Sequence, residues 1–389
     1  MSYVRLLDIA GASIFSAFEC LLINTRCGLD FSMACAGWAA VIVLFHHVFV
    51  DGLPANDFMA DRLFWARIFF MNGTFAVCLF FVISGFSLSI SYLQTGDERG
   101  LARMAAGRYV RLVIPIFAIC SITYLLLALN IIPPSGERPH PLDIFGTFTP
   151  SVAGLFEFSF IGAFVFQSNV ENYDPPLWTM FYEFLGSFMV FATVALVRSW
   201  RLRTLMLAIL FVALALCEPF FSLFVAGILV ADIFRQGETS RSHNIAGAIL
   251  CGAGLLLTLL PAPWPLLKYV AAPVCLVAGV AMFGPARRLF ENRLGSFLGW
   301  ISFPLYLVQA AVIYSVSVRG LDLLASFGFE AAQQRWIVGV ATLPVAIFFA
   351  VLFCPINDFA VRLARRFGAA LFRSASRPAG YLGAKSRPA

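Results

Sequence analysis

Hydrophobic residues along this chain gather in runs of about 18 to 25 residues, each long enough to cross a bilayer as a helix. Proline and glycine pairs, such as Pro133-Pro134, Pro175-Pro176 and Gly284-Pro285, interrupt the pattern between runs and are typical of helix ends. Ten runs can be marked, with starts near residues 34, 68, 109, 177, 202, 219, 243, 265, 294 and 336. The pattern predicts an all-α, polytopic membrane bundle of about ten transmembrane helices.

The flanks of this region have a different character. Residues 1–33 predict an N-terminal segment that is interfacial or partly buried, and residues 34–361 form the predicted transmembrane domain. Residues 362–389 are basic and rich in Ser, Gly and Pro, so we expect a disordered tail that is attracted to anionic lipid. Between the third and fourth runs, the apolar stretch GLFEFSFIGAFVFQ predicts a re-entrant or interfacial helix.

Composition supports a membrane protein. Hydrophobic residues make up 60% of the chain, charged residues only 12%, and the mean hydropathy is +0.86. The net charge of +6 does not indicate nucleic acid, because the basic residues form short clusters beside the apolar runs. Nineteen of the 27 Lys and Arg flank one set of helix ends and six flank the other. The positive-inside rule therefore predicts that both termini are cytoplasmic.

Nine cysteines are spread along the chain without CxxC or Cys/His ligand spacing. Most lie inside apolar runs, so we expect small packing residues and no metal site. No Gly-rich nucleotide loop is present, and we expect no tightly bound cofactor.

Two adjacent histidines, His46 and His47, are half of the four in the chain and lie in the first apolar run. An ionisable ring inside hydrocarbon usually faces a partner or a water-filled cavity. Neighbouring helical residues point about 100° apart, so we expect only one ring to face a pocket. Glu183, about 9 Å into the fourth run, is the partner that the sequence offers.

Further polar and aromatic residues lie inside the runs. Trp178 and Tyr182 share a helix wall with Glu183, while Tyr306 and Gln309 are three residues apart on one face of the ninth run. Ser84 belongs to a polar stretch of the second run. For these types the ordinary interpretations are helix packing for Ser and interface anchoring for Trp and Tyr.

A basic cluster precedes and enters the third run. Arg99, Arg103, Arg108 and Arg111 satisfy the positive-inside rule, but Arg111 lies within the span, where orientation does not require it. Guanidinium groups pair with phosphate oxygens in a bidentate manner. The cluster therefore suits a ligand that carries several phosphates.

Together, five segments resemble the successive motifs of the membrane-bound acyltransferase 3 family, whose members O-acylate bacterial surface glycans. In chain order these are GWAAVIVLFHH (37–47), FFVISGF (80–86), RYVRLVIP (108–115), PLWTMFYEF (176–184) and LGWISFPLYLV (298–308). The resemblance implies a multi-pass protein of the bacterial inner membrane. It also implies an acyl-CoA co-substrate, expected to be acetyl-CoA, that is engaged from the cytoplasm, and a carbohydrate acceptor on the outer side.

The resemblance suggests a role for each candidate. His47, or His46 in another register, is expected to be the general base, with Glu183 balancing its charge. Arg103, Arg108 and Arg111 are expected to hold the CoA phosphates. The remaining candidates are expected to line the donor or acceptor path: Ser84, Trp178, Tyr182, Tyr306 and Gln309.

Two positions depart from the family pattern. Ala36 stands where the first helix of the family usually has arginine, and Gln309 stands where the ninth often has histidine. Two alternatives therefore stay open: a transporter or flippase for a glycan, and a catalytically degenerate member that only binds acyl groups or partners. Internal inverted repeats, common in transporters, are not evident.

Overall fold

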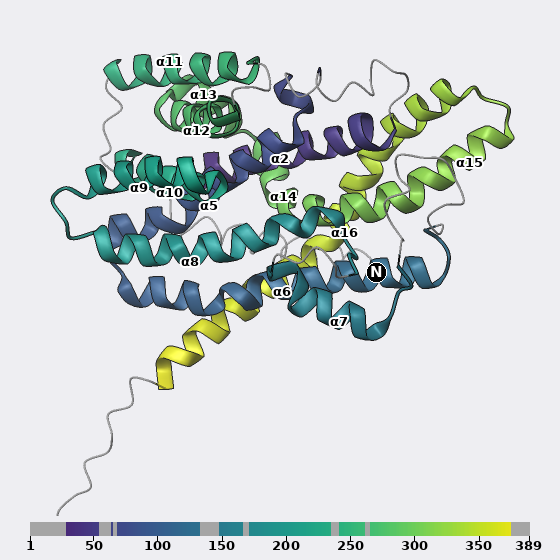
Figure 1. Ribbon diagram of the computed structural model, residues 1–389, viewed down its shortest axis with the longest axis horizontal. Helices are drawn as coiled ribbons and strands as arrows, with labels where there is room; N and C mark the ends of the chain where they lie inside the picture. Colours follow the sequence, from purple (N-terminus) through teal and green to yellow (C-terminus); the bar gives the residue numbers. More distant parts are fainter. Residues whose placement is uncertain are drawn as a thin grey trace, which may run out of the picture.

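The computed structural model describes residues 29–53, 64, 68–132, 148–165, 171–234, 241–260 and 265–374. Within these residues every regular element is a helix (Figure 1). The predicted interfacial segment, except for its last few residues, lies outside the described residues, as do residues 375–389.

The described residues of the first half of the chain contain four long helices and several short elements. In chain order they are α2 (Leu29–Phe45), the π-helical turn η1 (His46–Gly52), η2 (Phe69–Met71), α5 (Gly73–Thr95), α6 (Glu98–Ala128), α7 (Val152–Phe160), η4 (Gly162–Phe164), η5 (Pro175–Trp178) and α8 (Thr179–Val197).

The second half ends in the longest helix, α16, with 44 residues. Its elements are α9 (Arg203–Cys217), α10 (Pro219–Phe234), α11 (Arg241–Thr258), η6 (Leu267–Ala271), α12 (Ala272–Met282), α13 (Gly284–Phe290), α14 (Arg293–Val312), η7 (Ile313–Ser317), α15 (Val318–Ser326) and α16 (Ala331–Ser374).

Six helical stretches among the described residues are long and apolar enough to cross a membrane, which confirms a multi-pass protein. They are Asp30–Gly52, Gly73–Thr95, Glu98–Ala128, Pro175–Val197, Arg293–Ser326 and Ala331–Phe372. A seventh is possible if Leu267–Met282 and Gly284–Phe290, bent by 96°, form one span. The predicted ten spans are confirmed only in part, because the runs near 202 and 219 form helices of only 15 and 16 residues.

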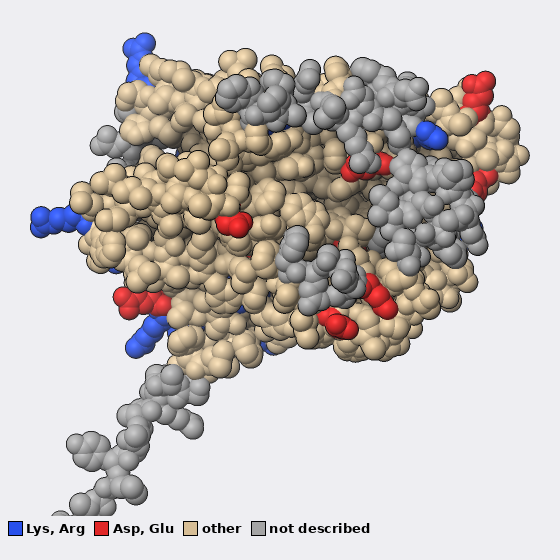
Figure 2. All heavy atoms as spheres, viewed as in Figure 1, with Lys and Arg blue, Asp and Glu red and all other residues tan. Residues whose placement is uncertain are grey.

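The long helices run between two ends of the bundle. At the histidine end, His46 lies against Gly73, the first residue of α5. At the opposite, basic end, Arg198 lies against Gly96, the residue that caps α5. On the face in Figure 2, Lys and Arg gather mostly on the left, where α5, α8 and α16 end, and the surface between the ends is largely uncharged.

Glycines allow close helix packing. A Cβ atom on Gly85 of α5 would lie 2.1 Å from the carbonyl oxygen of Phe224 in α10. Conversely, a Cβ on Gly227 of α10 would lie 2.2 Å from the carbonyl oxygen of Val82. The α5 and α10 backbones are therefore in direct contact, as small residues permit in membrane bundles.

One predicted boundary is wrong. The sequence predicts that a disordered tail begins at residue 362, but α16 continues to Ser374. The helix persists because it packs on α6: a Cβ on Gly368 would lie 2.4 Å from the Arg103 carbonyl oxygen, and one on Gly107 would lie 2.7 Å from that of Ala364. Backbone contact of this kind stabilises a helix beyond its apolar stretch.

The apolar stretch before the fourth run also forms a helix. α7 follows Ser151, whose side chain accepts a hydrogen bond from the Gly154 amide at 2.9 Å. Tyr109 of α6 donates a hydrogen bond to the carbonyl oxygen of Phe160 at 2.8 Å, so α7 lies along α6.

Candidate active site

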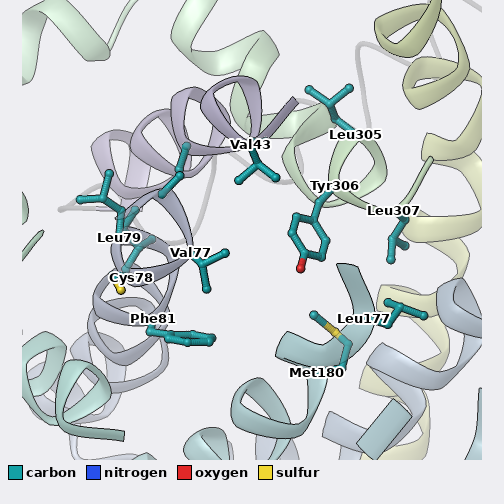
Figure 3. Close-up of a cluster of buried hydrophobic side chains, with 14 of the residues drawn as sticks. Val43, Val77, Cys78, Leu79, Phe81, Leu177, Met180, Leu305, Tyr306 and Leu307 are labelled. Carbon is teal, nitrogen blue, oxygen red and sulfur yellow. The ribbon is translucent and has the colours of Figure 1, made fainter. Parts of the chain in front are cut away.

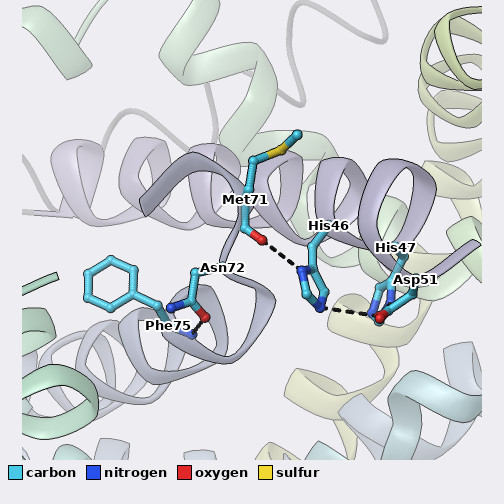
Figure 4. Close-up of polar contacts among 6 residues, drawn as sticks. All are labelled: His46, His47, Asp51, Met71, Asn72 and Phe75. Atoms are coloured by element: carbon cyan, nitrogen blue, oxygen red, sulfur yellow. Dashed lines mark hydrogen bonds and ion pairs between the residues drawn. The ribbon is translucent and has the colours of Figure 1, made fainter. Parts of the chain in front are cut away.

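Both histidines converge on one carboxylate, Asp51 (Figure 4). His46 Nε2 lies 3.2 Å from Asp51 Oδ2, and His47 Nδ1 lies 3.1 Å from the same oxygen. Both rings reach Asp51 because residues 46–52 form a π-helical turn and not an α-helical one. The wider turn brings residues four and five positions apart onto one side, and such turns are frequent at functional sites.

The hydrogen bonds distinguish the two rings. His46 Nδ1 lies 2.7 Å from the carbonyl oxygen of Met71, which can only accept, so Nδ1 carries the proton. Both ring nitrogens of His46 thus have protein partners. His47 uses Nδ1 for Asp51, and its Nε2 has no hydrogen-bond partner among the described residues. His47, with a side chain 34% exposed, is the ring that can take a proton from a ligand.

Glu183 occupies a different site. Its Oε1 accepts a hydrogen bond from Ser84 Oγ at 2.5 Å and forms an ion pair with Arg108 Nη2. Arg108 Nε also donates to Ser187 Oγ at 2.7 Å, and Ser187 donates to the carbonyl oxygen of Glu183. The pair therefore joins α5, α6 and α8 in the middle of the bundle.

The expected pairing of Glu183 with the histidines is not what the structure shows. Ser84, which contacts Glu183, lies eleven residues beyond Gly73, which contacts His46. That spacing is about 16 Å along α5 at 1.5 Å per residue. Asp51 is the carboxylate that partners the histidines, and Glu183 balances the charge of Arg108.

The other two arginines of the basic cluster differ in burial. Arg111 has its guanidinium over the Phe303 ring, 5.1 Å from the centroid, and its Nη1 is buried without a hydrogen-bond partner. Arg103 is exposed near the basic end. Among the three, Arg111 has a donor inside the bundle, Nη1, that no group of the described residues uses.

Tyr306 and Gln309 lie between these two sites. The Tyr306 hydroxyl donates to the Pro176 carbonyl oxygen and lies 2.7 Å from Thr179 Oγ1, which joins α14 to the start of α8. Figure 3 shows the Tyr306 ring leaving α14 with its hydroxyl directed toward Met180. Gln309 is fully buried, and its Nε2 donates to the Tyr306 carbonyl oxygen at 3.1 Å.

Trp178 and Tyr182 belong to an aromatic cluster with α10. Their ring centroids are 6.1 Å apart, and each packs against Phe220, at 5.9 and 5.0 Å. Trp178 is 43% exposed. This cluster is distinct from the contacts of Tyr306.

Sequence reasoning missed two acidic residues. Asp51 follows His47 by four residues, the spacing of a helical side-chain pair, so a signal was present. Asp174 is only 1% exposed, and burial raises the pKa of its carboxyl well above its usual value. Its position before two prolines indicates a loop and gives no sign of burial.

These features define a class: a multi-pass helical membrane protein with a His–carboxylate site at one end and an Arg–Glu pair inside the bundle. A profile of the acyltransferase 3 family, described as an acyltransferase domain, matches residues 37–355. The chain belongs to this family. No curated protein and no solved structure matches it.

Proposed function

We propose that this protein is an integral membrane O-acyltransferase that moves an acyl group, acetyl in the simplest case, from acyl-CoA to a hydroxyl of a cell-surface or exported carbohydrate. The observation that carries the proposal is the His47 ring, held through Nδ1 by Asp51 and with Nε2 open to a ligand. A base oriented in this way by a carboxylate is the arrangement that activates a hydroxyl.

In the proposed reaction, His47 Nε2 accepts the proton of the acceptor hydroxyl while the hydroxyl oxygen attacks the thioester carbonyl carbon. The carbon–sulfur bond breaks, the ester forms, and the departing CoA thiolate takes up the proton from His47. Asp51 stabilises the imidazolium between these steps. His46, whose nitrogens bond the Met71 carbonyl and Asp51, holds that carboxylate in place.

The donor is proposed to enter from the basic end. That end is assigned to the cytoplasm by the distribution of Lys and Arg. The unpartnered Nη1 of Arg111 supports a phosphate contact inside the bundle, with exposed Arg103 nearer the entrance. Arg108 is held by Glu183 and contributes less free charge. Ser84 lies at that pair, on the path between the basic end and the histidines.

The proposal is tested by surface-glycan analysis of a strain lacking the gene and of strains complemented with variants. Loss of an ester in the deletion strain would name donor and acceptor together. His47→Ala should reduce ester formation at least about a hundredfold, the usual contribution of a general base. His46→Ala should reduce it less, because His47 keeps its contact with Asp51.

His243→Ala is the matched control, since His243 lies on α11, apart from the histidine pair. Each variant is quantified in membranes by immunoblot, so that loss of protein is not read as loss of activity. Full ester formation by the His46→Ala/His47→Ala double variant would reject the catalytic assignment.

Vesicles with purified protein separate the proposal from its alternatives. An acyltransferase incorporates labelled acetyl into glycan, whereas a flippase moves glycan without modifying it. Binding of acyl-CoA without turnover over many acceptors would indicate a degenerate member.

A further inference from the structure

Asp174 is a buried acid. Within the described residues, no contact of its side chain shows a role in holding the fold. Neither carboxylate oxygen has a hydrogen-bond partner in the described part of the chain. It precedes η5, yet its side chain does not cap that element. Only its backbone is engaged: its amide donates to Asn172 Oδ1, and its carbonyl oxygen accepts from the Leu177 amide, both at 3.0 Å. Burying such a group without partners is costly.

A second buried side chain is half-satisfied in the same way. Gln309 Nε2 donates to the Tyr306 carbonyl oxygen, but Gln309 Oε1 is buried with no hydrogen-bond partner among the described residues. Within the described residues, Asp174 and Gln309 together present three buried oxygen atoms without a hydrogen-bond partner.

Both residues lie near one level of the bundle. The Tyr306 hydroxyl bonds to the Pro176 carbonyl oxygen, which fixes α14 against the start of α8. Gln309 is three residues beyond Tyr306, about 4.5 Å closer to the histidine end. Asp174 precedes Pro176 by two residues, on the same side of that contact.

Electrostatic interactions connect this level to the histidines. Asp174 lies within electrostatic range of the hydroxyls of both Tyr306 and Tyr314. The charge of Asp51, the partner of His46 and His47, acts on the same Tyr314 hydroxyl. Tyr314 is therefore within electrostatic range of both Asp174 and the carboxylate that orients the base.

We propose that Asp174 and Gln309 bind hydroxyl groups of the carbohydrate acceptor and thereby present a further hydroxyl to His47. Sugar hydroxyls both donate and accept, so they can satisfy the carboxyl group of Asp174 and the amide oxygen of Gln309. This site rests on the proposed function, since it gives the acceptor its place beside the base.

A hydroxyl ligand fits better than a cation. Burial favours the uncharged form of Asp174, which donates one hydrogen bond and accepts another but does not attract a cation. In the described part of the chain, no three His, Cys, Asp or Glu side chains group as metal ligands would. An uncharged acid and an amide oxygen near one level of the bundle suit two hydroxyl groups of the same sugar.

The test replaces Asp174 and Gln309 separately with Leu, which has a similar size and no hydrogen-bonding atoms. Removing a buried acceptor without a protein partner should leave the thermal midpoint in detergent unchanged or raised. A purely structural role predicts a lower midpoint instead. Asp322→Leu, on α15, is the matched aspartate control.

Binding is measured by saturation-transfer NMR with methyl glycosides of the gluco, galacto and manno series. Wild-type protein and Asp322→Leu should bind at least one of them, and Asp174→Leu should bind it about tenfold more weakly. Acyl-CoA affinity should be equal in all variants. Deoxy analogues of the bound glycoside should have lower affinity for the wild type. If removing one hydroxyl lowers the affinity of the wild type but not that of Asp174→Leu, Asp174 contacts that hydroxyl.

Equal glycoside binding by wild type and Asp174→Leu would overturn the site. Absence of binding by the wild type would also overturn it and would leave buried water as the partner of these oxygens. Glycoside binding that depends on Asp174 without any acyl transfer would sustain the site and reject the proposed reaction. The two failures are thus distinguishable.

Discussion

Glu183→Gln should destabilise the protein by leaving a positive charge without its partner. The Glu183 carboxylate pairs with Arg108 and accepts from Ser84 at 2.5 Å. The side chains of Glu183 and Arg108 are only 16% and 14% exposed, so solvent can replace little of the lost interaction. The substitution keeps the size of residue 183 and removes only its charge.

The expected cost follows from the burial. Removing one partner of a buried ion pair costs about 3–5 kcal/mol, and the residual exposure here favours about 3 kcal/mol. Arg108→Met should cost a similar amount, because it strands the carboxylate. The double variant strands neither charge, so its cost should fall below the sum of the single costs by on the order of 2 kcal/mol.

The assay is reversible unfolding of purified protein in mixed micelles, for wild type, both single variants and the double variant. Glu157→Gln is the control, since Glu157 is exposed on α7 and should change the free energy of unfolding by less than about 0.5 kcal/mol. Strict additivity of the two single costs would refute the coupling. A Glu183→Gln variant that is stable but inactive would instead support a catalytic role for Glu183.

Three further outcomes are expected. Gly85→Ala should cost about 3 kcal/mol, because its Cβ would lie 2.1 Å from the Phe224 carbonyl oxygen, whereas Gly252→Ala, with nothing within 4 Å of the added Cβ, should be neutral in the same unfolding assay. Asp97→Ala should cost about 1 kcal/mol, since Asp97 caps α6; the loss is measured in the same micelles. The raised pKa of Asp174 means that the folded state holds this proton more tightly than the unfolded state. Stability should therefore fall as pH rises from about 4 through the folded-state pKa, and a pH series on Asp174→Asn should lack that slope.

The sequence predicted the all-helical, multi-pass class because lipid imposes a local rule, although only six of the ten predicted spans are long enough among the described residues. A span must satisfy its own backbone hydrogen bonds, so its length and apolarity are visible in one window of residues. The helices Gly73–Thr95 and Pro175–Val197 begin within a few residues of the predicted starts. The end of α16 was mistaken because its stability comes from contact with α6, which residues 362–374 do not reveal.

The site was predicted as a set of residue types and not as a set of pairs. His47 and Asp51 are four residues apart, so their pairing was accessible from spacing. Arg108 and Glu183 are 75 residues apart, and only the folded bundle brings them together. The π-helical turn that brings both His46 and His47 to Asp51 has no periodic signature in the chain.

The glycine contact between α5 and α10 also limits how an acyl group can travel. With the Gly85 and Gly227 positions touching backbone across the interface, no room is left there for a hydrocarbon or pantetheine chain. On the proposed function, a donor that starts at the basic end has to pass along another face of α5, such as the face about 100° away where Ser84 bonds Glu183. The same two glycines that let α5 and α10 pack closely thus also exclude this interface as a route for the acyl group.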